Sequence, residues 1–181
     1  MYKRNTLVMV LLLAFVIGCS AALTEETCQL DTMLLDVSSF PNNIWEEIGS
    51  RDSRGAPSKL GIERAGTSFS TPTQGVAVHI IYKFATSDEA NEVFPQLESS
   101  WFNLAPEGSV WLSPIELQNL NLNSDNHKID CFTKEIETCQ FVARYENYVV
   151  EFKTDMPALT YPDFIHLLDA IDQNMLMCIN G

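Results

Sequence analysis

Positively charged residues are scarce in this 181-residue chain. It contains 11 Lys and Arg against 24 Asp and Glu, a formal net charge of −13 at pH 7. Binding to nucleic acid requires clustered Lys and Arg that neutralise phosphates, so this balance argues against a nucleic-acid partner. It also argues against purely electrostatic binding to an anionic membrane. Apolar residues make up 46% and charged residues 19%, a composition typical of a folded globular protein.

Motifs of the common catalytic classes are also absent. The sequence contains no HExxH, GxSxG, P-loop or GxGxxG motif and no zinc-deaminase signature. Only three histidines occur, His79, His127 and His166. We therefore expect no catalytic residues, metal or cofactor, and favour a protein without enzymatic activity.

Two patterns could nevertheless hold a metal ion. His166, Asp169 and Asp172 have i, i+3, i+6 spacing on a predicted helix, where a solvated acidic face is the commoner explanation. Asn121, Asn123 and Asp125 have the spacing that starts an EF-hand loop. The glutamate that such a loop needs at its twelfth position is replaced by phenylalanine, so the bidentate ligand is missing.

Long apolar runs are limited to one, residues 7–18 (LVMVLLLAFVIG), which follows Lys3 and Arg4. Twelve helical residues span about 18 Å, whereas the hydrocarbon core of a bilayer is ~30 Å thick. A basic start followed by an apolar run of this length is typical of a secretory signal peptide. The sequence thus predicts a cleaved signal and not a permanent transmembrane helix.

The end of this run, Val16-Ile17-Gly18-Cys19, resembles the lipobox of bacterial lipoproteins. The resemblance implies cleavage between Gly18 and Cys19 and a lipid on the Cys19 sulfur, with the protein on the extracytoplasmic side of a bacterial membrane. Residues 1–18 would be the signal peptide, 19–27 the lipid-anchored N-terminus with a short tether, and 28–181 a single domain. The alternative is ordinary secretion, with cleavage at the small residues that follow Cys19.

The number of cysteines supports the lipobox. Without Cys19 four remain, Cys28, Cys131, Cys139 and Cys178, and an even number in an exported chain predicts two disulfides with three possible pairings. Cys131 and Cys139 are close enough in sequence to join adjacent strands, which leaves Cys28 for Cys178. Free thiols or a zinc site are the alternatives, and the cysteine spacing lacks the CxxC of common zinc sites.

Hydrophobic patterning predicts strands over residues 60–69, 76–84, 128–133, 138–145 and 148–153. In 76–84, we expect the alternate residues from Val76 to Phe84 to pack on the core, with His79 half-exposed on the other face. Glu146-Asn147 predicts a two-residue turn in which Asn147 tolerates positive φ.

Helices are predicted after Pro41, from Thr86 or Ser87 with a kink or restart at Pro95, and over residues 161–177. In the last helix Thr160 and Asp163 form a capping-box pattern. The element order predicts an α+β fold: one domain with a mostly antiparallel sheet covered by helices and a C-terminal amphipathic helix. The loop at 49–59 gathers the basic residues Arg51, Arg54 and Lys59.

Three segments carry a further resemblance: YKFATSDEANEVF from Tyr82, the downstream Trp101, and CQFVARYENYVVEF from Cys139 followed by a helix. They resemble small secreted α+β domains of the PsbP/LpqN and PknH-sensor kinds, which are mostly accessory or sensor modules. The resemblance implies binding of an unidentified protein or small ligand. The alternatives are a small extracytoplasmic hydrolase that uses carboxylates and a histidine, and a subunit of an envelope complex.

Overall fold

The computed structural model describes residues 28–49, 63–73, 75–103 and 105–180. The predicted signal peptide, the predicted lipidation site Cys19 and the basic residues Arg51, Arg54 and Lys59 lie outside the described residues, as does the side chain of Trp101. None of the helices within the described ranges has the length and apolar character needed to cross a bilayer.

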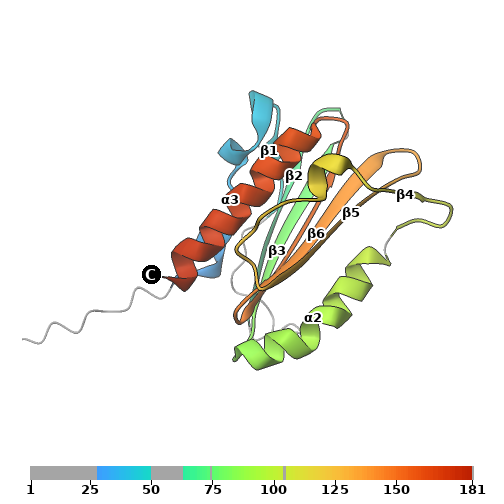
Figure 1. Cartoon of the computed structure of the whole chain (residues 1–181). Coiled ribbons are helices and arrows are strands. Elements are labelled where there is room, and N and C mark those ends of the chain that lie inside the picture. The colour runs from blue at the N-terminus through green and yellow to red at the C-terminus, as the bar shows by residue number, and fades with distance from the viewer. Residues whose placement is uncertain (1–27, 50–62, 74, 104, 181) are drawn as a thin grey trace, which may run out of the picture.

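A seven-stranded antiparallel sheet forms the centre of the molecule, with strand order β1-β2-β3-β7-β6-β5-β4 (Figure 1). The strands are β1 (Glu46–Glu47), β2 (Glu63–Ser70), β3 (Val76–Lys83), β4 (Val110–Leu112), β5 (Asn126–Thr133), β6 (Glu137–Tyr145) and β7 (Tyr148–Asp155). The helices are α2 (Ser87–Phe102) and α3 (Tyr161–Ile179), with short 3-10 turns η1 (Leu30–Met33), η2 (Val37–Ser39), η3 (Pro41–Asn43) and η4 (Ile115–Leu117). The predicted α+β class is confirmed.

The sheet is covered on both faces. Leu167, Leu168 and Ile171 of α3 belong to the larger core, together with Leu30 and Met33 of η1. On the other face, Phe94 and Leu97 of α2 pack with Tyr82 and other residues of β3, β6 and β7 in a second cluster. Because neighbouring residues of a strand point to opposite faces, each central strand contributes to both clusters. Figure 1 shows α2 and α3 on opposite sides of the sheet.

The prediction for the two faces of β3 was right for one face and wrong for the other. His79 is fully buried, and its neighbours Ala77 and Ile81 belong to the larger core under α3. The face that we expected to pack on the core does so in the smaller cluster under α2, where Ile80 and Tyr82 are buried, although Val76 is exposed. A strand between two helical layers has no solvent face, so its alternation cannot tell which layer is larger.

Local features of the turns and helices differ in detail from the predictions. The chain after Pro41 forms only the 3-10 turn η3 and then β1, because Asn42 and Asn43 have positive φ and end the helical path. In the β6–β7 turn the residue with positive φ is Glu146, not Asn147. The α2 helix continues through Pro95, and its ribbon bends about midway (Figure 1).

The C-terminal helix begins as predicted. The Thr160 side chain accepts a hydrogen bond from the Asp163 N–H, while the Asp163 carboxylate accepts one from the Thr160 N–H at 2.8 Å. Pro162 occupies the first turn, where its missing N–H costs nothing.

The structure contains both predicted disulfides. Cys28–Cys178 joins the start of the described chain to the last turn of α3. Cys131–Cys139 joins directly opposed residues of β5 and β6, eight positions apart in sequence. The two bridges therefore lie in different parts of the molecule and fix different segments.

Candidate functional site

The tip of the β5–β6 hairpin bears two pockets, one on each face of the sheet. Glu137 and Thr138 are consecutive at the start of β6, so their side chains point to opposite faces. Glu137 lines a pocket on the α3 face, and Thr138 lines one on the α2 face. Cys139 follows immediately, and its bridge to Cys131 holds this part of the hairpin in register.

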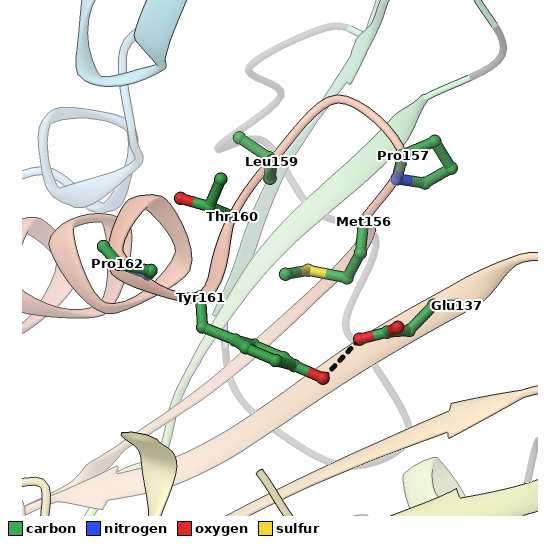
Figure 2. A pocket seen from close by; sticks show the side chains of 7 residues that line it. All are labelled: Glu137, Met156, Pro157, Leu159, Thr160, Tyr161 and Pro162. Atoms are coloured by element: carbon green, nitrogen blue, oxygen red, sulfur yellow. Dashed lines mark hydrogen bonds between the residues drawn. The ribbon is translucent and has the colours of Figure 1, made fainter. Parts of the chain in front are cut away.

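The pocket on the α3 face, called here the tyrosine pocket, has a volume of about 360 Å³. Its walls come from the start of β6, the β7–α3 connection and the first turn of α3 (Figure 2): Glu137, Met156, Pro157, Leu159, Thr160, Tyr161 and Pro162. The Tyr161 hydroxyl donates to Glu137 Oε1 at 2.6 Å. Desolvation and the neighbouring carboxylate raise the pKa of Tyr161 to about 12, so its hydroxyl stays a donor. This pocket is acidic and otherwise mostly apolar.

The pocket on the α2 face, called here the lysine pocket, has a volume of about 370 Å³. It is lined by Pro106, Phe132, Lys134, Glu135, Ile136, Thr138 and Lys153. The Phe132 ring, which is packed edge-on by Trp111 at 5.5 Å, gives it an apolar floor. Both pockets have volumes near the lower end of the range for small-molecule sites, about 300–1,000 Å³.

Lys134 and Lys153 distinguish this second pocket electrostatically. Lys83 pairs with Glu63, and Lys128 lies within 3.6 Å of both Glu98 and Asp130. No carboxylate of the described chain lies within ion-pair distance of either Lys134 or Lys153. The two unpaired lysines of the described residues therefore share one pocket, in a chain that carries 24 acidic residues.

Gln140 lies beside the lysine pocket and is fully buried. It is two residues along β6 from Thr138, on the same face, and it is the direct cross-strand neighbour of Lys153. Neither atom of its side-chain amide has a hydrogen-bond partner. A buried polar group without a partner costs about 1–3 kcal/mol, which makes it rare in folded proteins and worth a physical explanation.

A third polar feature of the α2 face is a buried carboxylate. Glu151 of β7 is 3% exposed and accepts a hydrogen bond from the Tyr82 hydroxyl at 3.1 Å. Burial raises its pKa to about 7, and the Tyr82 hydrogen bond and the Arg64 charge oppose this shift only in part. The Arg64 guanidinium lies 5.7 Å from the centre of the Tyr82 ring. Glu151 can therefore exchange a proton near neutral pH.

The histidines do not assemble an acid–base site. His79 Nδ1 accepts a hydrogen bond from the Leu35 N–H at 3.0 Å, and burial lowers the pKa of His79 to about 3. His127 Nδ1 lies 3.0 Å from the Ser124 hydroxyl, and His166 is exposed on α3. Within the described ranges, no group of three or more His, Cys, Asp or Glu residues could hold a metal ion.

We expected Asp172 to lie on a solvated helix face, but it does not. It is buried at 6% exposure and accepts hydrogen bonds from the Tyr145 hydroxyl at 3.0 Å and from the Asn123 N–H at 2.8 Å. The Asn123 side-chain amide donates to its second oxygen at 2.6 Å. Asp125 pairs with Arg144 at 2.9 Å. Asp172, Asn123 and Asp125, which belong to the two candidate metal patterns, thus hold the fold together instead.

Sequence reasoning missed the lysine pocket because its parts are far apart in sequence. Lys134 and Lys153 come together only through the register of β5, β6 and β7. One signal was available in the sequence. Gln140 is the polar residue in the otherwise apolar strand segment CQFVA, and residues of such segments are usually buried. A partnerless amide cannot be recognised without the surrounding structure.

Comparisons with known proteins place the fold. Neither a protein-family model nor a curated protein sequence matches this chain. Among solved structures, the extracellular domain of PknH from Mycobacterium tuberculosis is similar, with a TM-score of 0.53 and 12% sequence identity. The match covers 81% of this chain and 94% of that one. At this identity the likeness shows the fold alone, and it supports the resemblance to PknH-sensor domains at that level.

Proposed function

We propose that this protein is a non-catalytic binding module on the extracytoplasmic side of a bacterial membrane, anchored by a lipid on Cys19. The observation that carries the proposal is the use of the cysteines. Of five cysteines, four are paired in the two disulfides, and the fifth is the last residue of the lipobox-like segment. A lipidated cysteine cannot join a disulfide, so this division is the one that a lipoprotein requires.

Two further observations favour an exported protein. Structural disulfides persist in oxidising compartments outside the cytoplasm, and this chain has two of them. The similar domain of PknH is itself extracellular, although the two sequences share only 12% identity. Neither observation requires an anchor, which depends on Cys19.

The positions of the pockets suit an anchored binding module. Cys28 is bonded to the last turn of α3, whereas Tyr161 at the first turn of the same helix lines the tyrosine pocket. Because α3 has 19 residues, its two ends lie roughly 28 Å apart. A tether over residues 19–27 would therefore keep the disulfide end near the membrane and direct the pockets away from it.

Binding fits the described chemistry better than catalysis. The described residues bring no histidine into a group of three or more potential metal ligands, and all four cysteines of the domain are oxidised. A cysteine nucleophile needs a free thiolate, which a disulfide does not provide. The two pockets instead combine apolar walls with a few fixed polar groups, as binding sites do.

The decisive experiment is the intact mass of the protein extracted from membranes, with thiol alkylation before and after reduction. We expect a mass that begins at Cys19 with added acyl chains, and four cysteines that are alkylated only after reduction. In a Cys19→Ala variant the acyl mass should disappear while both disulfides remain. A wild-type mass that begins at or after Ser20, without lipid, would overturn the anchor.

A further inference from the structure

The side chain of Lys153 crosses β6 beside Gln140. In the strand order β7-β6-β5, Lys153 is on β7, yet its Nζ lies 5.9 Å from the ring centre of Phe132 on β5. Residues 153, 140 and 130 are directly aligned across the three strands, and Phe132 is one step further along the same face. The Lys153 side chain therefore extends over β6 between Gln140 and Thr138, next to the fully buried Gln140 amide.

The Lys153 side chain can move. A lysine stem is a flexible chain of four carbons, and the Lys153 ammonium contacts the Phe132 ring at 5.9 Å and has no carboxylate partner in the described chain. An anion that entered the lysine pocket would attract the ammonium groups of both Lys153 and Lys134. Movement of the Lys153 stem toward that anion would expose the amide of Gln140.

The exposed amide would present one donor and one acceptor side by side. A ligand that satisfies both must itself carry an acceptor next to a donor, as a peptide group does. A simple inorganic anion offers acceptors only and would leave the Gln140 oxygen without a partner. The apolar floor at Phe132 and the wall at Ile136 leave space for a small side chain.

We infer that the lysine pocket binds the carboxyl-terminal end of a peptide. The terminal carboxylate pairs with Lys153 and Lys134, the last peptide group pairs with the Gln140 amide, and the last side chain lies against Phe132. A volume of about 370 Å³ limits the bound part to roughly the last two residues. The inference rests on the proposed function as a binding module and names the chemical class of its ligand.

The test is calorimetric titration of the full protein, extracted in detergent, with N-acetyl-alanylalanine. We expect saturable binding that weakens about tenfold or more when the terminal carboxylate of the probe is converted to an amide, because the charge-assisted contacts are lost. Lys153→Gln should weaken binding of the carboxylate probe by a similar factor and should have little effect on the amidated probe.

Matched variants separate the pocket from general effects of charge. Lys83→Gln removes the same charge from β3, where Lys83 pairs with Glu63, and should leave the affinity unchanged within about twofold. Gln140→Leu keeps the side-chain volume and removes both unpaired polar atoms, so the protein should stay folded and bind about tenfold more weakly. Thermal unfolding of each variant checks that it is folded.

Three results would each overturn the inference. They are no saturable binding of N-acetyl-alanylalanine up to about 10 mM, equal affinity for the carboxylate and amide probes, and equal affinity of the wild type and Lys153→Gln for the carboxylate probe. None of these would affect the lipid on Cys19, which the mass measurement tests separately. Conversely, an unlipidated protein that binds the probe would refute the anchor and leave the pocket assignment intact.

Discussion

Glu151 is a buried carboxylate, so it lacks the water that normally stabilises the charged form of such a group. It lies on the α2 face of β7, the central strand of the sheet, and it accepts a hydrogen bond from the Tyr82 hydroxyl. Removing a carboxylate from water disfavours its charged form, so burial raises the pKa of Glu151 from 4.5 to about 7. In the unfolded chain the same group ionises near its ordinary pKa.

This difference predicts a dependence of stability on pH. Because the pKa is higher in the folded state, the contribution of Glu151 to stability is fully present below pH 4.5 and is lost as the pH rises through 7. Glu151→Gln stays neutral and can still accept from Tyr82. Relative to this variant, the wild type should lose roughly 2–3 kcal/mol of unfolding free energy between pH 5 and pH 8, measured by urea denaturation at both values.

An exposed carboxylate provides the control for Glu151. Glu92 lies on the solvent side of α2, and Glu92→Gln should reproduce the wild-type loss of stability over the same range. If Glu151→Gln instead lost as much stability as the wild type between pH 5 and pH 8, the ionisation of Glu151 would not be coupled to folding.

His79 shows why single residues were hard to place from the sequence. It occurs in VAVHIIYK, where alternation assigns it to the less apolar face and suggests partial exposure. In the structure the segment after η1 passes over this face, and the Leu35 N–H donates to His79 Nδ1. Burial depends here on a segment 44 residues earlier in the chain, which no local pattern includes.

At the scale of elements the sequence is more informative. Five strands and two helices were predicted close to their observed bounds, because alternation, capping and turn residues act within a few positions of one another. The Thr160–Asp163 capping box is such a local signal. The missing information concerned which face of an element packs where, as the double-sided burial of β3 shows.

Asp172 adds a polar connection to the apolar contact between α3 and the sheet. Its carboxylate accepts from Tyr145 of β6 and from both the N–H and the side chain of Asn123, so one residue connects the helix, a strand and a loop. Asp172→Ala would leave these buried or partly buried donors without their acceptor. We expect a loss of about 2–4 kcal/mol in unfolding free energy, measured by urea denaturation at pH 7.

The neighbouring helix position separates this network from helix propensity. Asp169 is exposed on the same helix, and Asp169→Ala should change the unfolding free energy by no more than about 0.5 kcal/mol. Tyr145→Phe removes one of the three hydrogen bonds and should cost about 1 kcal/mol. Equal losses for Asp172→Ala and Asp169→Ala would show that the network contributes nothing to stability.

For the whole molecule, the two disulfides have different tasks. Cys28–Cys178 joins the two ends of the described chain and keeps the N-terminal turns packed on α3 and the sheet. Cys131–Cys139 closes only the hairpin whose tip lines both pockets. The first bridge thus determines how the chain is closed around its core, and the second fixes the local geometry of the candidate site.

Their contributions to stability should follow the length of chain that each one closes. In the chain-entropy model a bridge restricts the unfolded state more as its loop lengthens. The sequence separations are 150 for Cys28–Cys178 and 8 for Cys131–Cys139, which correspond to about 5 and about 2.6 kcal/mol respectively. Replacing both cysteines of a bridge with serine should therefore destabilise the protein about twice as much for the long bridge as for the short one.

The measurement is urea denaturation of the two double-serine variants and of the wild type, all without reductant. Wild type in reductant serves as the reference, because it should lose approximately the sum of the two effects if the bridges act independently. A short-bridge variant that loses as much free energy as the long-bridge variant would contradict the entropic account. It would mean that Cys131–Cys139 stabilises the native hairpin directly, so that the geometry of both pockets depends on this bridge beyond its effect on the unfolded chain.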